Sequence, residues 1–172
     1  MHSTLPQNSN INILPIKAFN DNYIWLLQEK LNGIIIDPGD AKPVIKTLIG
    51  KDIDLKAILI THKHYDHTGG VEELIKHYPD VQIFGPENIE FKFKYIIVKE
   101  DDVISISGTK VRFNVIETPG HTLDHIVYVD KENLFCGDTL FACGCGKLFE
   151  GTYSEMFKSL LTNKEKSLFT IT

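Results

Sequence analysis

The feature that most constrains this chain is a short polar segment, rich in histidine, between an expected strand and an expected helix. Residues 57–60 form an apolar run typical of a buried strand, and residues 71–78 carry apolar side chains at helical spacing. Between them stand His62, His64, Asp66 and His67. Because ligands bind at the carboxyl ends of strands in α/β sheets, this placement predicts a site at that edge. A solvated polar turn would explain one or two histidines, but not this spacing.

Imidazoles at this spacing favour metal binding. An H-x-H pair fixed by a strand end can direct two imidazoles at one ion, and the Asp-His pair that follows can serve a second ion beside it. Two later residues, His121 and Asp138, each lie on a turn just after an apolar run. If these turns share one edge of the core, the candidate ligands are His62, His64, Asp66, His67, His121 and Asp138. Imidazole and carboxylate suit zinc, manganese or iron. Taken alone, His121 could be an ordinary turn histidine.

Length and composition favour one domain with a substantial core. The chain has 172 residues, 42% of them hydrophobic. Its net charge of -5 gives no indication that nucleic acid or an anionic membrane is a partner. We find no apolar run of about 18 residues and no leader pattern, so neither a membrane span nor a secretion signal is expected. The three cysteines, an odd number without a leader, are expected to be reduced thiols in a cytoplasmic protein.

The order of the expected elements predicts an α/β layered domain over residues 11–172, after a flexible tail at residues 1–10. Strands are expected at residues 11–16, 22–28, 33–37, 57–60, 81–84, 95–98, 103–106, 110–117, 125–129 and 133–136. Helices are expected at residues 41–49, 71–78 and 153–161, the last with Ser154 as a possible cap. Asp37, at the end of an apolar strand, is either a buried hydrogen-bonding carboxylate near the site or a turn residue.

The motif T-H-x-H-x-D-H at residues 61–67, followed by Gly-His-Thr at 120–122 and Gly-Asp-Thr at 137–139, resembles the metallo-β-lactamase superfamily. The similarity covers about residues 11–161 and is closest to the glyoxalase II (hydroxyacylglutathione hydrolase) branch. Two segments carry this closer match, AFNDNY at residues 18–23 and LFCGDTLFACGCGKLFEGT at 134–152. The resemblance implies a metallo-β-lactamase-like αβ/βα sandwich.

The resemblance also implies a dinuclear centre and its chemistry. The first ion would be held by His62, His64 and His121, the second by Asp66 and His67, with Asp138 bridging. The ions would be divalent, with zinc expected and iron or manganese as alternatives. They would activate a hydroxide, oriented by Asp66, to hydrolyse S-(2-hydroxyacyl)glutathione, such as S-lactoylglutathione, in methylglyoxal detoxification. In similar enzymes Lys147 and the backbone near Phe149 contact glutathione, although Lys147 alone could be a surface lysine.

Two departures from the family pattern lead to further expectations. Asp124 stands where the family usually has glycine. The chain ends at Thr172, before the family's next strand, which carries a further histidine, and before its helical C-terminal domain. The sandwich is therefore expected to be truncated at its C-terminus, its second metal site to lack one histidine, and its activity to be weak. The alternatives are an inactive metal-binding remnant, or another activity of this fold such as glutathione persulfide dioxygenase.

Overall fold

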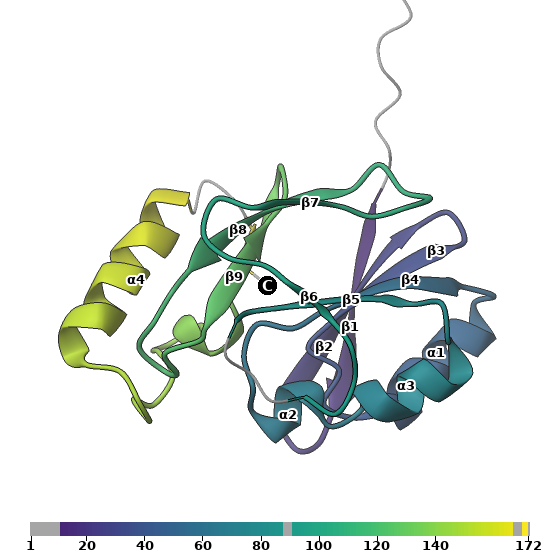
Figure 1. Ribbon diagram of the computed structural model, residues 1–172, viewed down its shortest axis with the longest axis horizontal. Coiled ribbons are helices and arrows are strands. Elements are labelled where there is room, and N and C mark those ends of the chain that lie inside the picture. Colours follow the sequence, from purple (N-terminus) through teal and green to yellow (C-terminus); the bar gives the residue numbers. More distant parts are fainter. Residues whose placement is uncertain (1–10, 88–90, 167–169, 172) are drawn as a thin grey trace, which may run out of the picture.

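The computed structural model describes residues 11–87, 91–166 and 170–171, with side chains described as far as Asn163. The tail expected at residues 1–10 lies outside the described residues. Two β-sheets stack face to face, and helices cover their outer faces: α1 and α3 lie against one sheet and α4 lies on the side of the other (Figure 1). This order of layers is the expected αβ/βα sandwich.

The first sheet has six strands in sequence order. They are β1 (Asn12–Ala18), β2 (Asn22–Glu29), β3 (Asn32–Ile36), β4 (Asp54–Leu59), β5 (Gln82–Gly85) and β6 (Ile96–Ile97). The first three pair antiparallel, and the expected hairpin joins β1 to β2. From β3 to β6 the pairing is parallel. Parallel neighbours need crossover connections, and α1 (Ala41–Gly50) and α3 (Val71–His77) provide two of them.

The second sheet has five strands. In spatial order they are β11 (Thr170–Ile171), β10 (Asn133–Phe135), β9 (Ile126–Val129), β8 (Arg112–Glu117) and β7 (Val103–Ser105). The strands from β7 to β10 pair antiparallel, whereas β11 pairs parallel with β10. The sequence had predicted no strand after the last helix. The structure differs because β10 offers a free edge, to which the β-branched Thr170–Ile171 pair adds.

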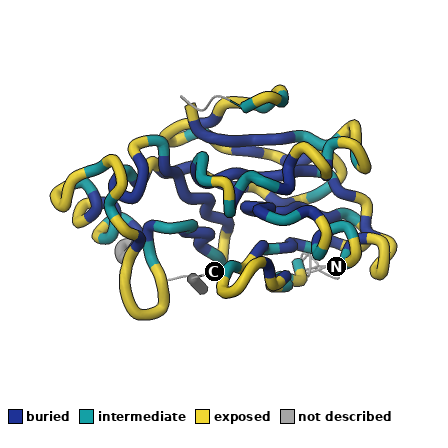
Figure 2. Tube along the Cα trace, turned by 90° about the horizontal axis from the view of Figure 1, so that it is seen from below, coloured by how far each residue is buried: buried dark blue, intermediate teal, exposed yellow. Residues whose placement is uncertain are grey.

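Alternating burial explains why the strands of the first sheet read as continuous apolar runs. Ile34 and Ile36 of β3 face the second sheet and join the cluster between the sheets, whereas Ile35 joins the cluster beneath α1 and α3. The centre of the molecule is accordingly a band of buried chain, with exposed residues concentrated at the turns and rim (Figure 2). A strand covered on both faces needs apolar residues at every position.

The helix starts follow local capping rules. Asp40 caps α1 by accepting a hydrogen bond from the amide of Lys42 at 3.0 Å, and Pro43 lies in the first turn, as expected. In α4 (Tyr153–Lys166) the prediction of Ser154 as the cap is wrong. Thr152 accepts from the Glu155 amide at 3.2 Å, and the Glu155 carboxylate accepts from the Thr152 amide at 2.7 Å. This is a capping box, which requires the serine or threonine to precede the first helical residue.

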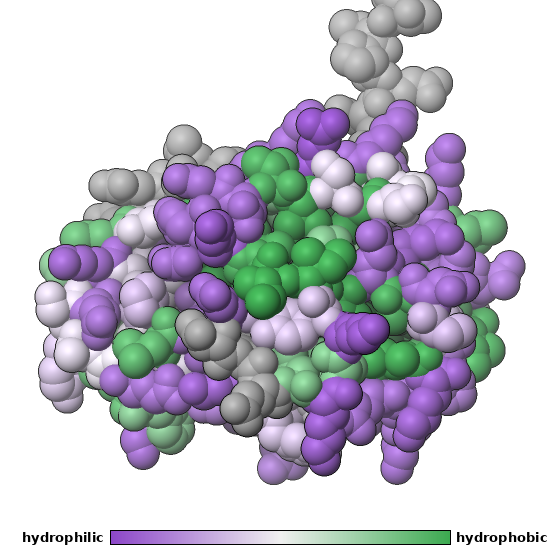
Figure 3. Space-filling model, in the orientation of Figure 1, coloured by the Kyte–Doolittle hydropathy of each residue, from purple (hydrophilic) through white to green (hydrophobic). Residues whose placement is uncertain are grey.

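The open edges of the two sheets carry exposed hydrophobic residues. β6 and β7 are edge strands, and Ile96, Ile97 and Val103 on them are all exposed. Figure 3 shows hydrophobic surface gathered near the middle of this face, framed by hydrophilic side chains. Among the described residues, no helix is both long and apolar enough to cross a membrane.

Candidate metal centre

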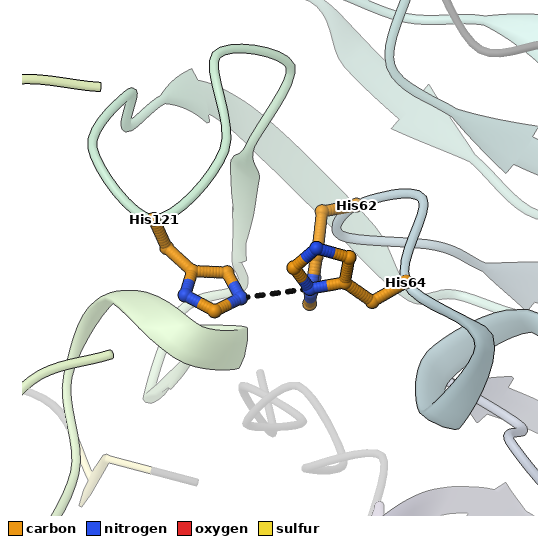
Figure 4. Close-up of side chains that lie close together, drawn as sticks. All are labelled: His62, His64 and His121. Carbon is orange, nitrogen blue, oxygen red and sulfur yellow. Dashed lines mark hydrogen bonds between the residues drawn. The ribbon is translucent and has the colours of Figure 1, made fainter. Parts of the chain in front are cut away.

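Three of the predicted ligands converge from separate turns at one edge of the sandwich. His62 and His64 follow β4, with His64 just before the short helix α2 (Tyr65–Thr68), and His121 lies on the turn after β8. The Nδ1 atom of His64 lies 3.0 Å from His62 Nε2 and 2.9 Å from His121 Nε2 (Figure 4). The structure therefore brings together the three histidines assigned to one ion.

The remaining ring nitrogens of two of these histidines are fixed by hydrogen bonds. His121 Nδ1 lies 2.7 Å from the carbonyl oxygen of Lys147, which can only accept, so this nitrogen carries the hydrogen. His62 Nδ1 lies 3.0 Å from the hydroxyl oxygen of Thr61. That hydroxyl donates its own hydrogen to Asp37 at 2.7 Å, so it accepts from His62. Both imidazoles consequently present Nε2 as a lone pair when neutral.

Two lone pairs thus face His64 Nδ1, which carries at most one hydrogen. The three nitrogens cannot satisfy one another by hydrogen bonds, but they can all donate to one cation. Burial, together with the neighbouring histidines, holds the pKa of His62 well below its usual value, and burial also lowers the pKa of His64. Neutral imidazole is the form that binds a metal. The donor set therefore fits a divalent cation.

Asp37 is the buried carboxylate that organises this edge. Its oxygens accept from the amide of Thr61 at 2.8 Å, from the Thr61 hydroxyl, and from His67 Nδ1 at 3.0 Å. It thereby orients His67 directly and His62 through Thr61. Of the two interpretations left open by the sequence, the structure has the buried hydrogen-bonding carboxylate. Such partners behind a ligating histidine fix its tautomer and ring orientation.

A second cluster adjoins the first and contains His67 and Asp138. Ligand atoms of His62, His67 and Asp138 all lie within 4.8 Å of one another. His67 Nε2 is buried and makes no hydrogen bond among the described residues, although it lies 3.2 Å from Asp138 Oδ1 and 3.5 Å from Asp66 Oδ2. The other oxygen of Asp138 lies 3.2 Å from His121 Nε2. Asp138 therefore faces both clusters, with one oxygen toward each.

The charges of the second cluster call for a positive partner. Burial opposes the charged imidazole of His67, but the Asp37 carboxylate, aided by Asp138 and Asp66, outweighs it and raises the pKa of His67 well above its usual value. Burial likewise opposes ionisation of Asp138, yet His67 keeps its pKa low. The pKa of Asp66 is lowered by His67 and by Asn22, whose amide donates to it at 2.9 Å. A bound cation would take the place of the positive charge that a proton otherwise puts on His67.

One buried histidine at this edge, His125, was not predicted from the sequence as a site residue. It was predicted only as the first residue of a strand, yet its Nε2 accepts a hydrogen bond from the backbone amide of Asp138 at 3.1 Å. Its Nδ1 lies 2.9 Å from the Thr118 hydroxyl and 3.1 Å from that of Thr139. Burial lowers the pKa of His125 to about 3, so the ring is neutral. A histidine in an otherwise apolar strand was the available signal.

The turn before Asp138 requires glycine at position 137. Its φ of +47° lies in the left-handed region. A Cβ at this position would lie 2.6 Å from Thr61 Oγ1 and 2.8 Å from His125 Nε2. Only glycine lets the backbone carry Asp138 this close to the histidines.

The predicted substrate residues Lys147 and Phe149 lie beside the first cluster. The amide of Phe149 donates to the carbonyl oxygen of His121 at 3.0 Å, and its ring centroid lies 5.2 Å from that of His64. Lys147 Nζ stands 5.1 Å from the centroid of the Phe149 ring, within cation–π range. This exposed pair is therefore attached to a candidate ligand through the backbone.

A cavity of about 1040 Å³ opens beside the second cluster. Asp66, His67 and Asp138 form part of its wall, and Trp25, Phe135 and Phe141 are among its apolar lining. Cys136 also lines it, and burial raises the pKa of its thiol to about 11. Among the residues that the structure describes, no disulfide joins the three cysteines. A concave, largely apolar site with a few convergent polar groups is typical of small-molecule binding.

Comparisons with known proteins agree with this geometry. A family model described as the metallo-beta-lactamase superfamily matches residues 19–168. The hydroxyacylglutathione hydrolase of Methylobacillus flagellatus is 48% identical over 148 residues, which are 86% of this chain and 59% of that protein. The enzyme of the same name from Photobacterium profundum is 48% identical over 151 residues, or 87% and 59% of the two chains. The chain thus spans about 59% of the length of these relatives.

Solved structures share the fold. The B3 metallo-beta-lactamase BLEG-1 superposes with a TM-score of 0.75 at 22% identity, over 88% of this chain and 83% of that chain. ETHE1 from Myxococcus xanthus gives 0.73 at 25% identity, over 88% and 68%. TTHA1623, solved in a di-iron-bound form, gives 0.73 at 22% identity, over 88% and 86%. The expected fold and the resemblance to hydroxyacylglutathione hydrolases are confirmed, and the chain belongs to the metallo-beta-lactamase superfamily.

Proposed function

We propose that this chain binds two divalent metal ions and hydrolyses thioesters of glutathione with 2-hydroxy acids, such as S-lactoylglutathione. The observation that carries the proposal is the convergence of one nitrogen each from His62, His64 and His121, beside an Asp138 whose two oxygens face His121 and His67. The 48% identity to two hydroxyacylglutathione hydrolases supports the choice of substrate. Release of glutathione and a 2-hydroxy acid would place the reaction in methylglyoxal detoxification, in the cytoplasm.

Each predicted ligand has a place in this proposal. His62, His64 and His121 would hold the first ion, Asp66 and His67 the second, with Asp138 between the two. Zinc suits imidazole and carboxylate donors, and iron or manganese would also fit. When bound, such ions polarise a carbonyl group and lower the pKa of water to about 7.

The chain's own residues would perform the remaining steps. Asp66 is 46% exposed on its side chain and is held by Asn22, so its carboxylate can accept a hydrogen bond from the attacking water and orient it. The departing thiol has an ordinary pKa of about 8.5, so the thiolate leaves without a general acid. No protonating side chain has to be assigned.

Lys147 and Phe149 would bind the glutathione part of the substrate. The ammonium of Lys147 stands above an exposed aromatic ring beside the first cluster, where it can pair with a carboxylate of glutathione. The largely apolar cavity that Asp138 helps to line leaves room for the acyl group. The thioester carbonyl would then lie between the two clusters.

The test is hydrolysis of S-lactoylglutathione by the purified chain with added zinc, followed through the released thiol. We expect turnover that a chelator abolishes and zinc restores. His64→Ala should lose both turnover and the first bound ion, whereas His77→Ala, on α3, should retain both. Folded protein that binds two ions without releasing thiol would reject the hydrolase and favour a metal-binding protein without turnover. Metal content unchanged in His64→Ala would reject the ligand assignment.

A further inference from the structure

Lys63 lies between two candidate ligands in the sequence, and its side chain meets carboxylates from two other segments. Its Nζ stands 2.5 Å from Glu150 Oε1 and 3.6 Å from Asp124 Oδ1. Its backbone amide also donates to Asp124 Oδ2 at 3.2 Å. The segment of His62 and His64 is thereby connected to Asp124 through both backbone and side chain.

Asp124 depends on this contact. Its side chain is only 4% exposed, and its Oδ1 atom makes no hydrogen bond among the described residues. A buried carboxylate is costly unless a cation or hydrogen-bond donors compensate it. Lys63 supplies a donor to one oxygen and a positive charge to the other. Asp124 lies three residues after His121, so the contact joins the two segments that bear the first cluster.

Glu150 connects the third segment to the same lysine. One of its oxygens contacts Lys63, and the other accepts from the amide of Leu123 at 3.0 Å. Glu150 directly follows Phe149, whose amide donates to the His121 carbonyl. The lysine and its two carboxylates therefore link the His62–His64 turn, the His121 turn and the segment proposed to bind glutathione.

We infer that Lys63 and Asp124 form a positioning pair for the first metal position, with Glu150 extending the pair to the substrate segment. The pair sets the distance between the turn that carries His64 and the turn that carries His121. Neither residue is a ligand. This inference rests on the proposed metal site. Breaking the pair should weaken metal binding roughly 10-fold or more, as expected when a residue that holds a metal ligand in place is removed.

A purely electrostatic role makes a different prediction, so the two can be separated. Removing the positive charge of Lys63 would strengthen binding of a cation through charge alone, whereas removing the negative charge of Asp124 would weaken it. If the pair acts by positioning, Lys63→Met and Asp124→Asn both weaken binding. The fold-loss in metal affinity of the double variant is then smaller than the product of the two single fold-losses, because both substitutions break the same contact.

The experiment measures zinc affinity by competition with a chromophoric chelator for the unsubstituted chain, the two single variants and the double variant. Lys56→Met is the matched control, because Lys56 is also partly exposed and paired with an aspartate, Asp54, away from the histidines. Thermal unfolding of the metal-free proteins shows whether each variant folds. Lys63→Arg, which can keep both contacts, should recover most of the affinity.

We expect each single substitution to weaken binding at the first position roughly 10-fold, with the Lys56→Met control unchanged. Opposite effects of Lys63→Met and Asp124→Asn, or affinities equal to that of the unsubstituted chain, would overturn the inference while leaving the proposed function intact. A lower unfolding temperature with unchanged affinity would likewise show a merely structural pair. Failure of the unsubstituted chain to bind zinc would refute the metal site and, with it, this inference.

Discussion

Replacing Asp37 by asparagine tests how the buried carboxylate supports the metal centre. Asp37 accepts three hydrogen bonds, two from Thr61 and one from His67 Nδ1. An asparagine has one acceptor oxygen, so its NH₂ group must face either the Thr61 amide or the His67 nitrogen. The first arrangement leaves a buried donor unsatisfied. The second turns His67 into the tautomer with hydrogen on Nε2, the atom that faces Asp138.

Either arrangement loses a buried hydrogen bond to a charged acceptor, so we expect the free energy of unfolding to fall by about 2–3 kcal/mol. Metal affinity at the second position should fall roughly 10- to 100-fold. Denaturant unfolding and zinc titration calorimetry measure the two effects. Asp40→Asn is the matched control, because Asp40 caps α1 and asparagine caps as well as aspartate. Asp37→Asn with the stability and metal affinity of the unsubstituted chain would refute this reasoning.

Three further predictions follow from the buried surroundings of the site. His125→Phe should lower the free energy of unfolding by about 1–3 kcal/mol, because the Asp138 amide loses its acceptor; denaturant unfolding measures this, and an unchanged midpoint contradicts it. Gly137→Ala should lower the free energy of unfolding by at least about 1 kcal/mol, since its φ is positive, whereas Gly50→Ala, at the end of α1 and with open space around its Cβ, should not lower it in the same assay. Because the thiol pKa of Cys136 is raised to about 11 in the folded protein, its contribution to stability is complete below the unfolded pKa of about 8.5 and is lost as pH rises toward 11. As pH rises through this range, the free energy of unfolding of Cys136→Ala should therefore fall less than that of the unsubstituted chain. Parallel curves of this free energy against pH for the two proteins would exclude the effect.

The sequence predicted the elements well wherever local periodicity carries the information. The expected strands and helices appear at nearly the expected residues, since apolar alternation and helical spacing depend only on neighbours along the chain. The errors are one helix cap and two short elements, α2 and β11, that were not predicted. Ser154 was proposed as a cap in place of Thr152, and β11 was not expected, because cap geometry and edge pairing depend on where each element starts and on what lies beside it.

For the site, the sequence by itself determined which residue types stand on which turns, and hence the six candidate ligands, whereas Lys147 and Phe149 came from the resemblance to the glyoxalase II branch. It left Asp37 open between two interpretations, overlooked His125, and gave no sign that Lys63 meets Asp124. Only the tertiary structure decided these points. A hydrogen bond or an ion pair depends on direction and distance between segments far apart in the chain, and those are set by how the two sheets stack, not by the residues next to each group.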